Sequence, residues 1–383
     1  MFRDSLSLAQ CEEDWSDIQN LCNERGIGRR DWRSDVGYGL MDVYLDAAGL
    51  QSDYCPDANV MHGLFLGMTD QWYLQSEANF RSVPVLIVHN EPDREHLQRV
   101  LGPAKKVVIL PHPFHYLIQS YQSVKKPERT GSVFFFPHSL GQTIPLVPVD
   151  YTLQKLCDLP AEYHPIDICL HVADVGEVLI AKVKSYGFGL VGCGHRHDPR
   201  FLHRFYWLCQ RRKYAINTDA STQLWLSALA GCDIVLLRGI PTVFMVPASD
   251  PWDYFEAARE NYWPLLDALE SQPIDQTLIR KLVGVNTGLE YWKSSEQLAQ
   301  LFTEANNLYF SWRNQDGRLV LPSRYWNFIE PLLRKFRAYS QSLGNHFSSN
   351  RGRWTIVNPD QPRLLMRYKR ACDEARQRSP REK

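Results

Sequence analysis

The sequence predicts an α/β protein built from two Rossmann-like domains (GT-B-like) with parallel sheets and a helical C-terminal region. Apolar runs alternate with helical patterns, and a polar, charged stretch at residues 119–131 interrupts this alternation once before it starts again. Strand, helix, strand with few residues between is typical of a parallel sheet. The runs interpreted as strands end in polar residues and lie at 83–88, 107–110, 132–136, 166–171, 189–192 and 214–216.

Length and charge limit the class of protein. The chain has 383 residues, enough for two domains of ordinary size, and 44% of them are hydrophobic. Its 43 basic and 43 acidic residues cancel, so overall charge gives no reason to expect nucleic acid as a partner. A charged ligand must therefore be recognised locally.

The nine cysteines contain no CxxC pair and no Cys/His ligand spacing. This pattern favours reduced thiols over disulfides or zinc, and we expect no metal. The N-terminus lacks the apolar core of a signal peptide, and no run of about 18 apolar residues occurs. We therefore expect a cytoplasmic protein.

The first half begins with a helical pattern at residues 6–23. Gly37 and Gly39 then precede the apolar spacing of an amphipathic helix, and we interpret them as a structural turn. The strand at 83–88 is followed by a helix at 93–101, and the strand at 107–110 ends at once in PHPFHY. Residues 1–125 are expected to form the N-terminal, acceptor-binding domain.

The second half repeats the pattern. Residues 126–300 are expected to form the donor domain, and residues 301–383 the C-terminal helices with a polar, basic tail beyond residue 345. The basic tail is either a solvated segment or a contact with anionic phospholipid, because each basic residue near such a surface contributes about 1 kcal/mol. The helices of the second half of the chain are predicted at 151–156, 178–186, 200–212, 276–286 and 294–312.

The stretch at residues 216–235 is the first candidate site. Thr218, Ser221 and Thr222 stand directly before a helical pattern that leads into an apolar run. Unpaired N–H groups and the positive end of the helix dipole make such a junction suitable for phosphate, although the same residues also suit an ordinary helix cap.

Histidines recur at the ends of the apolar runs, where a parallel sheet presents ligands. A neutral imidazole can act as a general base and a protonated one can neutralise phosphate, but each ring can equally be structural. In LPHPF, Pro113 fixes a bend that holds the preceding histidine at a set angle. The five histidines are His62, His112, His138, His171 and His195.

The loop GCGHRHDP at residues 192–199 is a second anion candidate. Gly194 gives it a flexible backbone, and Arg196 beside His195 offers a fork of donors that matches phosphate or carboxylate. A metal site here is disfavoured, because adjacent ligands on one short loop rarely close a coordination sphere. Asp174, after another strand, is open as a general base or a helix cap.

Two long segments, LPAEYHPIDICLHVADVG and GLVGCGHRHDPRFLHRFYWLCQRRKYAINTDASTQLWLSALAG, together with MHG and ILPHPF, carry a family resemblance. The chain resembles bacterial lipopolysaccharide and capsule biosynthesis proteins that are glycosyltransferase-like and follow the two-Rossmann GT-B plan. Its His-Pro and Ser-Thr pairs are also similar to motifs of bacterial sialyltransferases and Kdo transferases. In those enzymes the histidine and the hydroxyls hold the nucleotide phosphate of a CMP-sugar.

This resemblance implies a metal-independent glycosyltransferase, hexosyl- or sialyl/Kdo-type, that uses a nucleotide-sugar donor as substrate and no cofactor. The acceptor would be a surface glycan or lipid-linked glycan, with the protein peripheral to the inner membrane. The donor phosphates would lie at His112, Ser221 and Thr222, with Ser139 beside His138 as a further candidate. The acidic triplet that holds the acceptor base in sialyltransferases is absent, so that role falls to His62, which has room beside Gly63, or to Asp174.

Two other functions remain open. A nucleotide-sugar epimerase shares the same architecture but needs paired acids and a base around one sugar ring. A non-catalytic member of a polysaccharide-synthesising complex would need no reactive groups at all.

Overall fold

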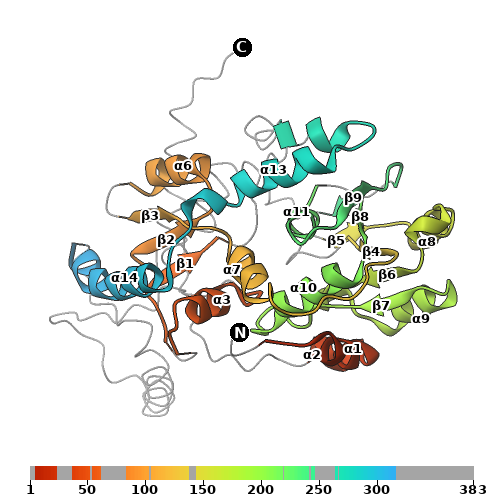
Figure 1. Ribbon diagram of the computed structural model, residues 1–383, viewed down its shortest axis with the longest axis horizontal. Coiled ribbons are helices and arrows are strands. Elements are labelled where there is room, and N and C mark those ends of the chain that lie inside the picture. Colours follow the sequence, from red (N-terminus) through yellow and green to blue (C-terminus); the bar gives the residue numbers. More distant parts are fainter. Residues whose placement is uncertain are drawn as a thin grey trace, which may run out of the picture.

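The structure, a computed structural model, confirms the predicted fold class: an α/β fold with two parallel sheets in two Rossmann-like units and a helical region after them (Figure 1). One unit lies on each side of Figure 1, and helix α7 (Pro113–Ser120) lies between them. The residues that the structure describes are 5–23, 37–51, 54–61, 83–102, 105–137, 144–218, 220–240, 243–245, 264–265 and 267–315.

The first unit contains a three-stranded parallel sheet in the order β1-β2-β3. Its strands are β1 (Ala58–Val60), β2 (Val85–Val88) and β3 (Lys106–Ile109), and helix α6 (Glu91–Leu101) joins the last two. The sequence indicated no strand at β1, because three residues are too few to show a period. Helix α6 begins where Asn90 caps it, accepting a hydrogen bond from the Asp93 N–H at 2.9 Å.

Strand β2 is buried on both faces of this sheet. Val85 and Ile87 belong to the core shared with helices α3 (Leu40–Ala47) and α14 (Ser295–Gln315). Leu86 and Val88 point to the other face and pack with Leu97 of α6. A continuous apolar run is therefore required here, because alternate residues of a strand face opposite sides.

The second unit contains a five-stranded parallel sheet in the order β7-β6-β4-β8-β9. The chain starts in the middle strand, moves outward to β6 and β7, and then crosses to β8 on the other side of β4. In open α/β sheets ligands bind outside the carboxyl ends of the strands at such a reversal. The strands are β4 (Ser132–Phe135), β6 (Ile166–Cys169), β7 (Gly189–Val191), β8 (Tyr214–Asn217) and β9 (Asp233–Leu236).

Helices cover both faces of this sheet. Phe134 packs in the core that holds α8 (Val149–Cys157) and α9 (Glu177–Ser185), whereas Phe135 faces α10 (Phe201–Arg211) and α11 (Thr222–Leu229). The helices before β7 therefore cover one face of the sheet, and the helices after β7 cover the other. The change of face occurs where the chain crosses from β7 to β8.

Each unit is also contacted by a helix from the other half of the sequence. Helix α1 (Leu8–Ser16) contacts α10 of the second unit, whereas α14 contacts α3 and β1 of the first. The domain boundaries at 125/126 and 300/301 stay predictions. The other elements are α2 (Ile18–Asn23), β5 (Ile144–Leu146), β10 (Val243–Met245), α13 (Gln276–Asn286) and the 3₁₀ turns η1 (Ala161–Tyr163), η2 (Val172–Asp174) and η3 (Leu289–Tyr291).

Aromatic side chains fill the seam between α7 and α10. Phe114 meets Phe205 edge to face with ring centroids 5.5 Å apart, and Tyr121 stacks on Tyr206 at 4.7 Å. The Tyr121 hydroxyl also lies 2.8 Å from Nδ1 of His203. These contacts, worth about 1 kcal/mol per aromatic pair beyond area burial, hold the two units together.

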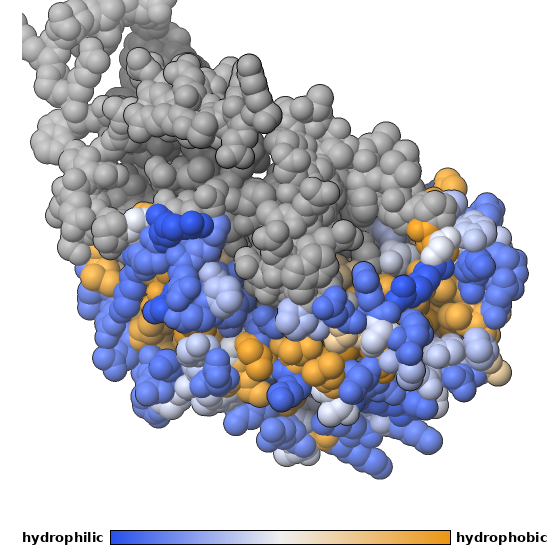
Figure 2. Space-filling model, turned by 90° about the horizontal axis from the view of Figure 1, so that it is seen from above, coloured by the Kyte–Doolittle hydropathy of each residue, from blue (hydrophilic) through white to orange (hydrophobic). Residues whose placement is uncertain are grey.

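Most of the coloured surface in Figure 2 is hydrophilic, with hydrophobic residues in groups between the polar ones. Scattered apolar side chains on a surface need no special explanation. Among the described residues no helix is long and apolar enough to cross a membrane. The basic tail of the sequence analysis lies outside the described residues. Exposed large apolar side chains in the described part of the chain are Tyr151, Val178, Leu278, Val285, Leu289 and Trp292.

Candidate functional site

A cavity of about 270 Å³ opens at the carboxyl edge of the second sheet. Residues at or just after the carboxyl ends of β4, β6 and β7 line it, together with the start of α11. These residues are Phe135, Phe136, Cys169, Leu170, His171, Cys193, Gly194, Ser221, Thr222 and Gln223.

The first unit also contributes residues to the lining. His112 enters from the start of α7, and Tyr38 and Leu40 enter from the start of α3. Helix α10 and the next turn of α11 add further apolar walls through Phe201, Leu202, Phe205 and Leu226. The described lining contains no Asp, Glu, Lys or Arg, so its polar groups are imidazole, hydroxyl, phenol, amide and thiol.

Four of the predicted site residues lie together around this cavity: His112, Gly194, Ser221 and Thr222. They come from three loops far apart in the sequence, and their role in binding stays a prediction. Of the other predicted residues, His62, His138 and Ser139 lie outside the described residues. Pro113, Asp174, His195, Arg196 and Thr218 are described but do not line the cavity.

The residues that lie near the cavity without lining it have local roles. Pro113 is the first residue of α7, and Asp174 ends the turn η2. The Arg196 guanidinium lies over the ring of Tyr38, 5.8 Å from its centroid, and so braces a lining residue from outside. Burial raises the pKa of Tyr38, which therefore keeps its phenol proton.

Sequence reasoning missed several lining residues. It named His171 among the strand-end histidines without selecting it, and it interpreted the turn Gly37-Tyr38-Gly39 as structural. That turn is indeed packed tightly, because a Cβ on Gly39 would lie 2.5 Å from the Pro199 carbonyl oxygen. The sequence gave no sign that Tyr38 reaches the strand ends of the other unit.

The strand-end histidines share one geometry. Nδ1 of His112 accepts a hydrogen bond from the Phe114 N–H at 3.2 Å, and Nδ1 of His171 accepts one from the Ala173 N–H at 3.2 Å. Because Nδ1 is the acceptor, the proton of the neutral ring is on Nε2. Each of these two rings is thus a cap for the backbone and a hydrogen-bond donor at its far nitrogen.

The Ser221 hydroxyl is fixed in a comparable way. Its oxygen accepts the Leu224 N–H at 3.3 Å, which caps α11, and also accepts the Asn217 side-chain N–H at 2.7 Å. A hydroxyl has two acceptor sites and one donor. With both acceptor sites occupied, Ser221 offers its proton to whatever else it meets.

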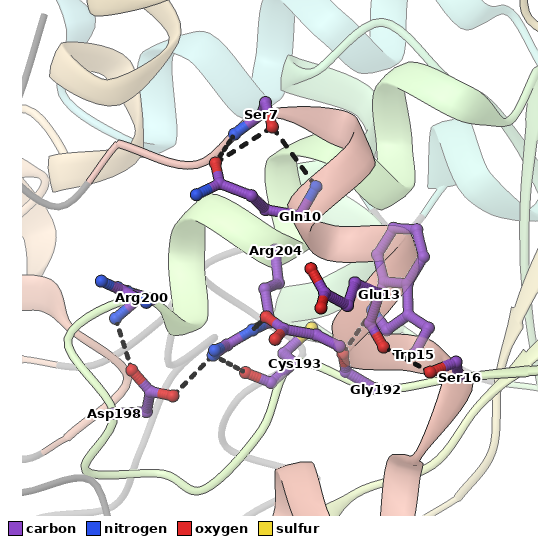
Figure 3. A network of polar contacts seen from close by, with 11 residues as sticks. Ser7, Gln10, Glu13, Trp15, Ser16, Gly192, Cys193, Asp198, Arg200 and Arg204 are labelled. Carbon is purple, nitrogen blue, oxygen red and sulfur yellow. Dashed lines mark hydrogen bonds and ion pairs between the residues drawn. The ribbon is translucent and has the colours of Figure 1, made fainter.

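Arg204 holds the loop that carries Cys193 and Gly194 (Figure 3). Its side chain is nearly buried and lies 2.6 Å from both Asp14 and Asp198, and it also donates to the Cys193 carbonyl at 3.3 Å. Burial alone would lower the pKa of Arg204, but the two carboxylates raise it above its usual value. The loop around residues 193–198 is therefore tied to α1 and α10.

The Cys193 thiol in the cavity wall is a poor nucleophile. A hydrogen bond with Cys169 and burial together raise the pKa of Cys193 well above its usual value. A protonated thiol does not attack or ligate, because the thiolate is the reactive form. Within the described part of the chain, no group of three His, Cys, Asp or Glu side chains is placed to hold a metal.

Helix α13 connects the two sides of the cavity. At its start, the Gln276 amide pairs with both the N–H and the carbonyl of Ile234, at 2.7 and 2.9 Å. At its end, the carbonyl of Thr287 accepts the His112 N–H at 2.8 Å, and its hydroxyl lies 2.7 Å from Nε2 of His115. The helix also packs along α11. One rigid element therefore sets the position of His112 relative to the second sheet.

No family model and no curated protein matches the sequence. Several solved structures are similar. Sucrose-phosphate synthase from Thermosynechococcus elongatus is 11% identical, with 66% of this chain and 68% of that chain covered and a TM-score of 0.30. UDP-GlcNAc 2-epimerase from Neisseria meningitidis bound to UDP-GlcNAc is 8% identical, with coverage of 70% and 80% and a TM-score of 0.33.

A third structure, of a GtfA/B complex, is 14% identical, with coverage of 70% of this chain and 55% of that chain and a TM-score of 0.28. TM-scores this low support no argument about chemistry. The argument for function therefore depends on the geometry of the cavity itself, and the family resemblance seen in the sequence stays a hypothesis.

Proposed function

We propose that the protein is a metal-independent glycosyltransferase that transfers a sugar from a nucleotide-sugar donor to a bacterial surface polysaccharide. The observation that carries this proposal is the position of the cavity. It lies where the second sheet reverses its strand order, and His112 of the first unit lines it together with Ser221 and Thr222 of the second. Nucleotides bind at such positions in open α/β sheets.

The donor phosphates would lie against the first turn of α11, with the Ser221 hydroxyl and the His112 imidazole as donors. Helix N-termini favour anions through their unpaired N–H groups and the helix dipole. In the transfer step, the acceptor hydroxyl oxygen bonds to the anomeric carbon while the bond from that carbon to the phosphate oxygen breaks. The same donors would stabilise the negative charge that develops on the leaving phosphate.

The proton of the acceptor hydroxyl needs a base. His112 and His171 carry their proton on Nε2 and use Nδ1 for the backbone, so neither ring suits this role. The described lining also offers no carboxylate. We therefore propose His62 as the base, because Asp174, the other candidate from the sequence, does not line the described cavity. An epimerase, which needs paired acids around one sugar ring, gains no support from this lining.

The remaining features of the proposal concern the acceptor and the location. The acceptor would be a glycan or a lipid-linked glycan on the cytoplasmic side. Basic residues beyond residue 345 would hold the protein near anionic phospholipid through about 1 kcal/mol each. No cofactor is proposed, because the donor itself is a substrate.

The test is to measure which of CMP, UDP, GDP and ADP raises the melting temperature of the protein. We expect one nucleotide to stabilise the wild type and the His62→Ala variant alike. Ser221→Asp should lose this effect, because Asp still caps α11 but replaces a donor with a negative charge. No shift with any nucleotide would argue for a non-catalytic component, and epimer formation without acceptor would refute transfer.

A further inference from the structure

The turn Gly37-Tyr38-Gly39, named the 37–39 turn below, has an unusual backbone. All three residues lie in the left-handed region, with φ of +101°, +65° and +68°. Glycine adopts such angles readily, but an aromatic residue rarely does, because its Cβ crowds the following carbonyl oxygen. A strained conformation of this kind persists only where surrounding contacts impose it, and it is concentrated at functional sites. The contacts of Tyr38 must therefore offset the strain in its backbone.

Those contacts come from the second unit. The Tyr38 N–H donates to the Arg196 carbonyl oxygen. The Tyr38 ring meets Phe201, the first residue of α10, edge to face with ring centroids 5.0 Å apart. The strained residue of the first unit is thus held by the backbone and by an aromatic ring of the second.

The two glycines let the backbones of the units approach each other closely. A Cβ on Gly37 would lie 2.7 Å from the Arg196 carbonyl oxygen, and a Cβ on Gly39 would lie 2.5 Å from the Pro199 carbonyl oxygen. Real Cβ atoms do not come so close to a carbonyl oxygen, so these positions require glycine. The whole 37–39 turn is therefore docked on residues 196–201.

The docking surface is fixed within the second unit. Asp198 pairs with Arg204 at 2.6 Å and accepts the Arg200 N–H at 2.8 Å (Figure 3). The 37–39 turn, by contrast, leads directly into α3, which packs against α7 and α14. Any relative motion of the two units would therefore separate the turn from residues 196–201.

Two sets of ring contacts join the units, and they differ in burial. In the seam between α7 and α10, Phe114, Tyr121 and Tyr206 are fully buried. Tyr38 and Phe201 are only half-buried, and both line the cavity. Contacts that are less buried open at a lower free energy than contacts in a core. Opening between the units should therefore begin at the 37–39 turn, beside the cavity, with the seam as the pivot.

We propose that the 37–39 turn controls access to the cavity: the cavity is closed while the turn is docked on residues 196–201, and a ligand enters or leaves when the turn detaches. The strain at Tyr38 opposes docking, so the turn can detach without unfolding of either unit. The inference rests on the proposed function only in concerning the same cavity, because the turn would control entry of any ligand that binds there.

Two glycines at opposite ends of α3 provide matched variants. Gly39 and Gly49 both have φ of +68°, so alanine suffers the same left-handed penalty at each position. Only Gly39 meets the second unit, whereas a Cβ on Gly49 would lie 3.7 Å from Ser295 Oγ, an ordinary contact. Gly39→Ala should therefore detach the 37–39 turn, and Gly49→Ala should leave it docked.

Access to the cavity is measured on the full chain without a nucleotide, as the rate at which iodoacetamide alkylates Cys169 in the cavity wall. Peptide mass spectrometry separates this thiol from the others. We expect Gly39→Ala to raise the rate roughly tenfold or more, and Gly49→Ala to leave it within about twofold of the wild type. Cys209 and Cys232, buried away from the cavity, should react no faster in either variant as long as the fold is intact.

A second variant decides the question if Gly39→Ala unfolds the protein, which faster alkylation of the two buried thiols would reveal. Asparagine tolerates the left-handed region, so Tyr38→Asn keeps the backbone of the turn. It has no ring to pack on Phe201, so the turn should again detach more easily and Cys169 should react faster than in the wild type.

The proposal is overturned if the folded variant, Gly39→Ala or else Tyr38→Asn, is alkylated at Cys169 no faster than Gly49→Ala. Failure of the glycosyltransferase proposal looks different. In that case no nucleotide raises the melting temperature, while alkylation of Cys169 still depends on the 37–39 turn.

Discussion

Acid should loosen the seam between the two units, because two buried histidines there are held neutral. Burial, helped by Arg200 and Arg204, lowers the pKa of His203 to about 4. Burial, helped by His89, lowers the pKa of His115 to about 4 as well. His203 contacts Tyr121 of the seam, and His115 contacts Thr287 at the end of α13.

The sign of the effect follows from these values. An unfolded histidine has a pKa near 6.5, so between pH 6.5 and pH 4 the unfolded chain binds protons that the folded protein excludes. The stability contributed by a neutral buried histidine is therefore fully present above pH 6.5 and is lost as the pH falls toward 4. For a shift from 6.5 to about 4, lowering the pH from 7 to 5 costs about 2 kcal/mol per histidine.

The assay is urea denaturation at pH 7 and pH 5 with the wild type, His203→Asn, His115→Gln and the double variant. Each substitution keeps a hydrogen-bonding atom near the nitrogen that is used, at Nδ1 in His203 and at Nε2 in His115, but removes the titration. Between pH 7 and pH 5 the free energy of unfolding should fall by about 2 kcal/mol less in each single variant than in the wild type. In the double variant it should fall by about 4 kcal/mol less. If the free energy of unfolding falls equally in the double variant and in the wild type, the two histidines do not cause the acid sensitivity.

Two further predictions concern single contacts and are measured by urea denaturation at pH 7. Gly288→Ala should destabilise by about 1–3 kcal/mol, because φ is +72° and the new Cβ would lie 2.3 Å from the His89 carbonyl oxygen. Gly284→Ala, four residues earlier inside α13 and with no atom within 4 Å of the added Cβ, should be neutral or stabilising. Equal losses of stability in the two variants would contradict this account. Asp198→Asn should cost about 3 kcal/mol because it breaks the buried pair with Arg204. Asp233→Asn breaks the ion pair with Arg280, in which both side chains are about one third exposed, and should cost less than about 1 kcal/mol. A similar cost for Asp198→Asn and Asp233→Asn would show that burial does not set the contribution of these ion pairs to stability.

The sequence alone predicted most of the regular elements, because their signals are local. The helix observed as Gln276–Asn286 spans the residues expected from its apolar period, and Asp275 caps it as the preceding polar residue should. The strands at 132–136 and 166–171 were recognised as apolar runs, and they are observed as Ser132–Phe135 and Ile166–Cys169. An error occurred where the signal was short, as in β1. Pro113, interpreted as fixing a bend after a strand, is the first residue of α7, a position that proline favours.

The sequence also indicated where strand ends would present polar residues, and His112, Gly194, Ser221 and Thr222 do line one cavity. It could not indicate that Tyr38 would join them or that Arg196 would not, because both outcomes depend on contacts between distant segments.

Tertiary structure decided the chemical character of the site. A histidine at a strand end can be a base, a cap or a donor, and only the position of the backbone N–H beside Nδ1 distinguishes these roles for His171. Likewise, Ser221 became a donor because Asn217 and the Leu224 N–H occupy its oxygen. The sequence determines which groups are present, because residue types and local periods are written in it. The fold decides which of their protons and lone pairs remain for a ligand, because hydrogen bonding depends on distances that packing alone sets.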